Sequence, residues 1–420
     1  HTKEAVISSI TGIEKHRAKV YELEKGDRML ESIKVISFTH YLQGPVAAQT
    51  LAYMGADVIK VEAQKGAFER SWSGANSFIE DVSIYFLAVD RNQRSIAVDL
   101  KTEEGKKIIY DIVKDADILI ENFRPGVMQK LGFGYETLHE INRRLIYCSC
   151  SGFGCSGPYE KRPGQDLLAQ AMTGILTLNG KRDDPPIPIG LAAADIHAAR
   201  LAVVGILAAL NAREESGEGM RVEGSLMGSA LDLQREPLTY YLNGFSLYER
   251  STSGLGSRFH PAPYGVYQTE NGWLCLAMMP MEKAATVFDD DSFLSYSPED
   301  CFTKREEVNE KVIAHMRSAT SECWRTKFRQ YDVWYSEVNE YDDIVHDSQV
   351  EWNQNFEEFE HPQAGKIRVL AHPVKYDGKR PRMRRLPPRL GEHTTEVLQQ
   401  LGYTEEQIRH MLRAGVVTQG

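Results

Sequence analysis

The stretch Pro185-Pro-Ile-Pro-Ile-Gly-Leu-Ala-Ala-Ala-Asp195 runs directly into Ile196-His-Ala-Ala-Arg-Leu-Ala-Val-Val-Gly-Ile-Leu-Ala-Ala-Leu210. The prolines and isoleucines of the first part favour an extended chain, whereas the alanines and leucines of the second part favour a helix. Apolar residues recur at helical spacing at Ile196, Ala199, Val203, Leu207 and Leu210. Asp195 is therefore predicted to lie where an extended segment turns into a helix that faces a core.

An aspartate at the start of a helix has two interpretations. It can be an N-cap, whose carboxylate accepts hydrogen bonds from the free N–H groups of the first turn. The N-terminus of a helix also favours a negative charge, which keeps a carboxylate ionised and available as a nucleophile. The stretch alone leaves both interpretations of Asp195 open.

The segments before this stretch predict a parallel α/β sheet. Leu145–Cys150 reads as a strand that ends in the glycine-rich turn Ser151–Pro158, and Arg162-Pro-Gly-Gln-Asp166 opens a helical segment to about Leu178. Earlier strands are predicted at 33–40, 58–62, 94–100 and 117–121, with helical segments between the first two and after the third. In such sheets the loops after the strands build the ligand crevice. The first turn lacks the glycine fingerprint G-x-G-x-x-G, so NAD is not expected.

The remaining chain predicts a second, smaller α+β domain. Residues 263–279 read as a β-hairpin, and charged helical segments follow from about Glu282 to Gln330. The tail returns to strands at 365–370 and 373–376 and to a helix at 394–401. We therefore expect an N-terminal helical extension (1–30), a large domain (31–225), a small domain with linkers (226–340) and a C-terminal part that rejoins the large domain (341–420).

Composition limits the function classes. The chain has 420 residues and a formal net charge of −10, which argues against general binding of nucleic acid. No apolar run approaches the roughly 20 residues of a membrane span, and the N-terminus lacks an apolar signal-peptide core. The six cysteines include no Cys-x-x-Cys pair and are expected to be buried thiols, with no metal site. A cytoplasmic protein is the expectation.

Several ordered motifs carry a family resemblance. They are Phe38-Thr-His-Tyr-Leu-Gln-Gly-Pro, Met54-Gly-Ala-Asp-Val-Ile-Lys-Val-Glu, Arg94-Ser-Ile-Ala-Val-Asp-Leu-Lys-Thr, Asp117-Ile-Leu-Ile-Glu-Asn-Phe-Arg-Pro-Gly, Gly152-Phe-Gly-Cys-Ser-Gly-Pro-Tyr, Arg162-Pro-Gly-Gln-Asp and Leu390-Gly-Glu-His-Thr. With them the chain resembles the class III CoA-transferases, also called the CaiB/BaiF family, which include the formyl-CoA transferases. The likeness extends from Ile33 nearly to the C-terminus.

The resemblance implies a fold and a reaction. Family members have a Rossmann-like large domain and a small domain, and two chains interlock as a homodimer. Their catalytic aspartate matches Asp195, which would attack an acyl-CoA and form an aspartyl anhydride and then an aspartyl-CoA thioester. The expected partners are an acyl-CoA and a carboxylic acid, with CoA as part of the substrate and with no metal or NAD.

The resemblance also implies binding residues. The family's CoA contacts carry over to His40, Leu42, Gln43, Ala63, Val98, Lys101, Asn122, Phe123, Arg124, Lys130, Gln165 and Asp166. Candidates for the acid pocket are Tyr41, Trp72, Arg258 and His260. Two departures from the formyl-CoA transferases concern specificity. Ala63 replaces an arginine that packs on adenine, and Leu42 replaces a glutamine of the oxalate-using enzymes.

Two alternatives remain open at this stage. An α-methylacyl-CoA racemase on the same fold pairs the matching aspartate with a histidine, but Gln165 occupies that histidine's position and cannot act as a base. A catalytically silent CoA-binding protein would keep the same loops. Deuterium uptake at an α-carbon distinguishes the first alternative, and CoA binding without chemistry distinguishes the second.

Overall fold

The structure is a computed structural model that describes residues 29–253 and 255–420. It divides into two compact units. The first unit comprises the described residues of His1–Cys150 together with Ala199–Glu223 and Gln354–Gly420, and the second unit comprises Ser151–Ala198 and Gly224–Asn353. Residues 151–198, expected in the large domain, thus cluster with the second unit, and the return to the first unit comes at Gln354 instead of 341. Of the predicted N-terminal extension (1–30), only Met29 and Leu30 are among the described residues. Gly254 also lies outside them.

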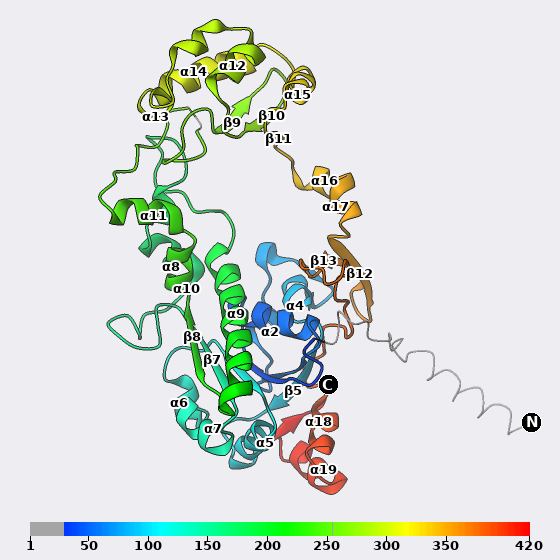
Figure 1. The fold of residues 1–420 in the computed structure, drawn as a ribbon. Coiled ribbons are helices and arrows are strands. Elements are labelled where there is room, and N and C mark those ends of the chain that lie inside the picture. Colours follow the sequence, from blue (N-terminus) through cyan, green and yellow to red (C-terminus); the bar gives the residue numbers. More distant parts are fainter. Residues whose placement is uncertain (1–28, 254) are drawn as a thin grey trace, which may run out of the picture. The chain divides into compact units, whose positions relative to one another are not determined.

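A mostly parallel β-sheet forms the centre of the first unit, which has an α/β fold (Figure 1). Among the described residues it has seven strands in the order β14-β5-β2-β1-β6-β7-β8. Their bounds are β1 Lys34–Phe38, β2 Asp57–Glu62, β5 Gln93–Val98, β6 Ile118–Glu121, β7 Ile146–Ser151, β8 Arg221–Ser225 and β14 Val417–Thr418. Strands β5, β2, β1, β6 and β7 pair in parallel, which confirms the predicted parallel sheet. Strand β14 pairs with β5 in the antiparallel direction.

Both faces of this sheet are covered, because its buried strands carry apolar side chains on each side. On one face, Ile36, Ile59 and Leu119 pack with helices from the middle and the end of the chain. Those helices are α5 Glu103–Val113, α6 Val127–Leu131, α7 Tyr135–Ile141, α18 Thr394–Gln400 and α19 Glu405–Arg413. On the other face, Val35 and Ile118 pack with α2 Gln43–Tyr53, α4 Ile84–Val89 and α9 Ala193–Ser216.

The C-terminal tail closes the sheet, as expected for a segment that rejoins the first unit. Strand β14 pairs with β5, and the N–H of His393 donates to the Ser95 carbonyl at 2.9 Å. Gly391 has φ +69, and a Cβ there would lie 2.5 Å from the Thr418 carbonyl oxygen, so the motif Leu390-Gly-Glu-His-Thr requires its glycine. The predicted strand at 365–370 is confirmed as β13 (Gly365–Leu370), paired with β12 (Phe356–His361). The predicted strand at 373–376 is wrong, since only an isolated bridge joins Tyr376 to Lys379.

The second unit has its own core. The predicted hairpin is confirmed as β9 Gly265–Gln268 and β10 Trp273–Leu276, and β11 Tyr335–Glu337 adds a third strand. Tyr267, Leu274 and Phe328 are among the buried residues of this core. The helices of the unit are α8 Asp166–Met172, η4 Ile175–Thr177, α10 Leu226–Asp232, α11 Arg235–Leu242, α12 Met281–Phe288, η5 Asp291–Ser295, α13 Asp300–Thr303, α14 Arg305–Met316, α15 Ser321–Gln330, α16 Tyr341–Ile344 and α17 Ser348–Trp352. Short elements of the first unit are α3 Phe68–Ser71, η3 Gly74–Asn76, β3 Phe78–Ile79 and β4 Val82–Ser83.

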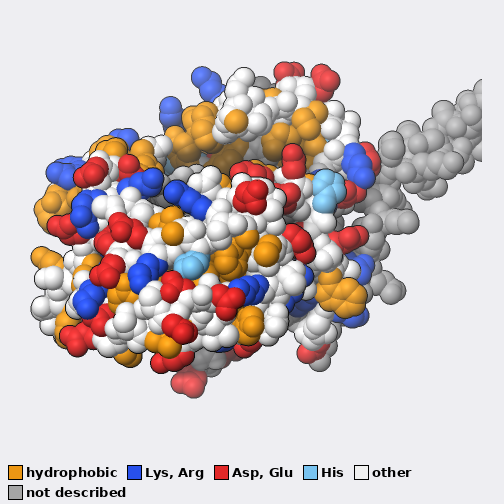
Figure 2. Space-filling model, turned by 90° about the horizontal axis from the view of Figure 1, so that it is seen from above, with side chains coloured by type: hydrophobic (Ala, Val, Ile, Leu, Met, Phe, Trp, Pro, Cys, Tyr) orange, Lys and Arg blue, Asp and Glu red, His pale blue; other side chains and the backbone are white. Residues whose placement is uncertain are grey.

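Helix α9 corrects one expectation about composition. With 24 residues, it is long and apolar enough to cross a membrane by length and composition alone, although no such run was expected. Core helices of soluble proteins can have the same length and composition. Its inner face packs Ala199, Val203 and Ile206 against the sheet. On the face of the molecule shown in Figure 2, acidic and basic side chains are intermingled with apolar ones.

Candidate active site

Asp195 lies in the first turn of α9, as predicted, but it is not the N-cap. The helix begins at Ala193, so Asp195 is its third residue. The N–H of Asp195 donates to Oδ2 of Asp166 at 2.9 Å. Asp166 is the buried first residue of α8. Its carboxylate accepts from a free N–H in the first turn of α9, which is the role that an N-cap side chain usually has in its own helix. This arrangement leaves the carboxylate of Asp195 free of the capping role.

Gln170 binds both Asp166 and the segment 185–192 that leads into α9. It lies four residues after Asp166, one turn further along α8, and is only 2% exposed. Its Oε1 accepts from the N–H of Ile189 at 3.2 Å, and its Nε2 donates to the Leu191 carbonyl at 3.2 Å and to Oδ1 of Asp166. Residues 185–192, which lead into α9, do not form a strand. The hydrogen bonds of Gln170 therefore take the place of sheet pairing in fixing where α9 begins.

The environment of Asp195 changes its acidity. Burial of the carboxyl group and the neighbouring carboxylate of Asp166 raise the pKa of Asp195 to about 7. The expectation that the helix N-terminus keeps this carboxylate fully ionised is therefore corrected, because burial and a like charge oppose the helix dipole. A carboxyl group that ionises near neutral pH is more basic than an ordinary aspartate, which suits a nucleophile.

The two glycine motifs of the second unit touch each other. A Cβ on Gly152 would lie 2.4 Å from Cα of Gly164, and a Cβ on Gly164 would lie 2.4 Å from Cα of Gly152. Only two glycines allow this approach of two main chains. Gly164 precedes Gln165 and Asp166, so the contact sets the position from which α8 starts.

The first unit has a turn of its own at the point where the strand order reverses. Between β1 and β6 the chain connections run to opposite sides, and ligands of open α/β sheets bind outside the carboxyl ends of such strands. The N–H of His40 donates to Oδ1 of Asn122 at 2.9 Å, and Nδ2 of Asn122 donates to the His40 carbonyl at 2.8 Å. Both main-chain groups of His40 are thus held by one side chain, and the predicted residues His40 and Asn122 lie together.

Two buried nitrogen atoms lie at or next to this turn without a hydrogen-bond partner among the described residues. Within the described part of the chain, Nδ1 of His40 and Nε2 of Gln43 are buried without a hydrogen-bond partner. Burial lowers the pKa of His40, so its imidazole is neutral at physiological pH. Buried polar atoms are normally satisfied, and a bound substrate can satisfy these two. Nε2 of Gln43 donates, whereas Nδ1 of His40 donates or accepts according to its tautomer.

The other CoA-binding candidates of the first unit differ in accessibility. Ala63, Lys101, Arg124 and Lys130 are exposed, and Leu42 and Phe123 are half-buried. The side chain of Val98 is buried in the core, so a contact of Val98 with CoA would be made by its main chain. Tyr41 and Trp72 are 44% and 42% exposed, and both rings contact Phe68 at centroid distances of 4.5 and 5.6 Å.

In the second unit, Gln165 is exposed at the cap of α8, beside the buried Asp166. Arg258 is already engaged, because its Nε donates to the Tyr248 carbonyl at 2.7 Å. The ring of His260 stacks on Tyr264 at 4.2 Å and bonds Ser257. These contacts favour structural roles for Arg258 and His260 over a role in the acid pocket. In the residues that the structure describes, no group of His, Cys, Asp and Glu side chains is arranged to hold a metal ion.

Comparison with known proteins places these features in context. The model of CoA-transferase family III matches residues 30–394. A succinyl-CoA:glutarate CoA-transferase from Mus musculus is 31% identical over 400 residues, covering 93% of this chain and 90% of the relative. A formyl-CoA:oxalate CoA-transferase from Streptomyces avermitilis is also 31% identical, over 417 residues that cover 93% and 100%. The crystal structure of a CaiB/BaiF family protein from Brucella suis aligns with a TM-score of 0.76 at 28% identity, covering 90% of this chain and 100% of that one.

Proposed function

Since the chain belongs to CoA-transferase family III, we propose that it moves CoA from an acyl-CoA to a carboxylic acid through covalent intermediates on Asp195. The observation that carries the proposal is the setting of Asp195. Its N–H is held by Asp166, its carboxyl group has a pKa of about 7, and it lies in the first turn of a helix. Aspartate is a suitable nucleophile for acyl transfer when it is ionised and shielded from water.

The proposed reaction has two mirrored halves. A carboxylate oxygen of Asp195 attacks the thioester carbonyl, the C–S bond breaks, and CoA leaves as a thiolate from a mixed anhydride. The thiolate then attacks the aspartyl carbonyl, which releases the donor acid and leaves an aspartyl-CoA thioester. The acceptor carboxylate attacks this thioester and releases the thiolate, which finally takes the acyl group from the new anhydride. The thioester energy is conserved throughout.

CoA binding is assigned to the turn of the first unit. The buried nitrogens of His40 and Gln43 and the exposed cations Lys101, Arg124 and Lys130 support this assignment, since the cations can pair with CoA phosphates. Two relatives that are each 31% identical to this chain are named for different acids, glutarate and oxalate.

The intact mass of the protein after incubation with a panel of acyl-CoAs and hydroxylamine tests the proposal. We expect an acyl or CoA adduct, trapped as a hydroxamate at Asp195. Deuterium uptake at an α-carbon without any adduct would support the racemase alternative. CoA binding without either signal would support a silent binder. Residue 165, which matches the catalytic histidine of the racemases, is a glutamine and cannot act as the second base beside Asp195.

A homodimer is the second part of the proposal. Apolar side chains of α9 and of the second unit's last segments are exposed in the single chain, with Val204 at 63%, Tyr341 at 86% and Trp352 at 81%. Large exposed apolar side chains gathered on an element mark an interface. We expect light scattering to give the mass of two chains, and a single-chain mass at micromolar concentration would contradict the dimer.

The pKa of Asp195 predicts a pH dependence. Because the ionised carboxylate is the nucleophile, kcat/KM for the acyl-CoA should rise with pH through about 7, and at pH 6 it should be about a tenth of its plateau. Asp166→Asn removes the like charge that helps to raise this pKa, so the midpoint of the profile should move to lower pH. Asp183→Asn removes the same charge from an exposed residue of the same unit and should leave the midpoint unchanged. A flat profile, or equal shifts in both variants, would contradict the assignment.

A further inference from the structure

The turn after β1 has an unusual form of support. Four consecutive main-chain groups are bound by side chains from elsewhere in the first unit: the Thr39 carbonyl, the N–H and carbonyl of His40, and the N–H of Tyr41. Asn122 binds the two groups of His40, as described above. The flanking groups of Thr39 and Tyr41 are bound by two charged residues, Lys60 and Glu69, that neither the reaction nor the CoA contacts use.

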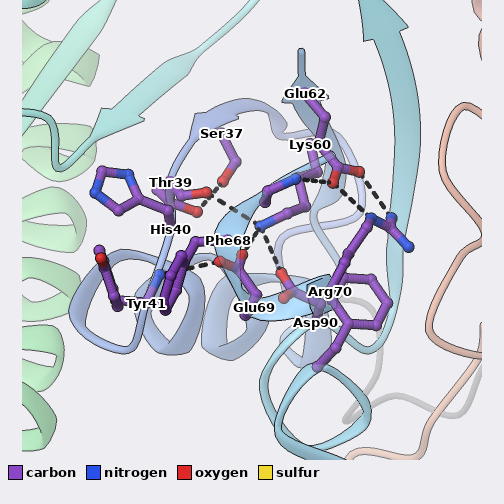
Figure 3. A network of polar contacts seen from close by, with 12 residues as sticks. Ser37, Thr39, His40, Tyr41, Lys60, Glu62, Phe68, Glu69, Arg70 and Asp90 are labelled. Atoms are coloured by element: carbon purple, nitrogen blue, oxygen red, sulfur yellow. Dashed lines mark hydrogen bonds and ion pairs between the residues drawn. The ribbon is translucent and has the colours of Figure 1, made fainter. Parts of the chain in front are cut away.

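Lys60 lies in the middle of β2, opposite Ser37 of β1, and its side chain is fully buried (Figure 3). Its Nζ donates to the Thr39 carbonyl at 3.1 Å and lies 2.7 Å from Oε1 of Glu69 and 2.9 Å from Oδ1 of Asp90. Burial alone would lower the pKa of Lys60, but Asp90, Glu69 and Glu62 together hold it above its usual value. The ammonium is therefore a fixed positive charge beneath the turn.

Glu69 connects this charge to the turn. Its side chain is also fully buried, and while Oε1 faces Lys60, Oε2 accepts from the N–H of Tyr41 at 3.1 Å. Tyr41 has φ +61, a left-handed conformation that side chains other than glycine rarely adopt. A conformation of this kind persists only where its surroundings hold it, and the carboxylate of Glu69 is the group that binds its N–H.

The charged residues around Lys60 leave its ammonium group to pair with Glu69 and Asp90 and to bind the Thr39 carbonyl. Arg70 binds both oxygens of Glu62 at 2.6 and 2.8 Å, so those two residues neutralise each other. Lys60 is left between two carboxylates, of which Glu69 contacts the turn and Asp90 does not. Burial raises the pKa of Asp90 to about 7 in spite of Lys60. Buried ion pairs contribute little net stability compared with apolar residues of the same size, so the contacts of Lys60 and Glu69 with the turn are the better account of this pair.

We propose that Lys60 and Glu69 are positioning residues, which fix the turn Thr39–Tyr41 and thereby present the rings of His40 and Tyr41 to the acyl-CoA. The two rings are 4.9 Å apart, and His40 also packs on Phe123 at 5.1 Å, so a shift of the main chain moves the whole group. This inference rests on the proposed function in one respect, namely that the turn binds the substrate.

Two isosteric variants provide a matched test. Glu69→Gln and Asp90→Asn each replace a carboxyl group beside Lys60 by an amide of the same size, but only Glu69 binds the turn. In Glu69→Gln one acceptor must serve both Lys60 and the N–H of Tyr41. We expect its Kd for CoA by calorimetry and its KM for the acyl-CoA to rise about tenfold or more, with a smaller change in kcat. Asp90→Asn should stay within about threefold of the wild type in both constants.

Further measurements keep folding and function apart. If Glu69→Gln does not fold, Glu69→Asp keeps the charge but shortens the reach, and it should weaken CoA binding in the same way. Equal effects of the Glu69 and Asp90 variants, or no effect of either Glu69 variant, would overturn the positioning role. If the wild type binds CoA but forms no adduct, the transferase proposal fails, and the Kd values still judge the positioning role. Failure of the wild type to bind CoA would overturn both.

Discussion

Replacement of Asp195 by alanine is expected to lower kcat by at least about a thousandfold and to abolish the covalent adduct, because the nucleophile is removed while its surroundings are kept. The contact with Asp166 uses the main-chain N–H of residue 195, which alanine retains. Alanine also favours a helix, so α9 should still begin where it does. Steady-state transfer between an acyl-CoA and an acid, together with intact mass, measures the effect.

Two controls isolate the carboxylate. Asp195→Asn keeps the size of the side chain and should be as inactive as the alanine variant. Asp183→Asn should be as active as the wild type, since this residue is exposed and comes before α9 in the chain. The thermal midpoints of the Asp195 variants should be equal to or above that of the wild type, because a half-buried carboxyl group with a raised pKa opposes folding when it is ionised. Residual activity within tenfold of the wild type would point to another nucleophile.

Gly152→Ala and Gly164→Ala are expected to have the next largest effects. A methyl group at either position would meet the other main chain at 2.4 Å, which neither side can absorb without moving. Overpacking of this kind costs roughly 1–3 kcal/mol of stability. Because Gly164 precedes Gln165 and Asp166, the shift reaches the carboxylate that holds Asp195, and a displacement of about 1 Å there can lower kcat/KM about a hundredfold.

Gly224→Ala is the matched control for these two variants. It lies in β8, and a Cβ there meets nothing within 4 Å. Urea unfolding and transfer kinetics should show it close to the wild type in both respects. If Gly152→Ala loses stability but keeps full activity, the glycine contact does not position Asp166. Loss of activity in Gly224→Ala to the same extent would mean that the assay reports general disruption.

The sequence predicted the sheet well because its signal is local. Runs such as Asp117-Ile-Leu-Ile-Glu121 are short, apolar and bounded by turn residues, and the strands lie where they predict. The position of Asp195 was also local, since it depends on where a proline-rich segment meets alanines. The helix α19 after Tyr403 was missed, although Thr404 and Gln407 form a capping box that could have indicated it.

The supporting contacts could not be predicted, because they join residues that are distant in sequence. Nothing in Val58-Ile-Lys-Val-Glu62 distinguishes a buried lysine from one at the edge of a strand, and its partner Asp90 lies 30 positions away in the chain. The contact of Gly152 with Gly164 depends on two turns folding against each other. Gln170 is the exception, since its spacing of four residues from Asp166 on a helix was available as a signal.

The pairing of β14 with β5 has a consequence for the synthesis of the chain. Strand β5 leaves the ribosome with Gln93–Val98, whereas its neighbour β14 arrives only with Val417–Thr418. At roughly 5–20 residues per second, the edge of β5 waits on the order of twenty seconds to a minute for its partner. An apolar strand with an open edge is a template for pairing with other chains. The nascent protein therefore depends on β14 to protect a strand that was made much earlier in the chain.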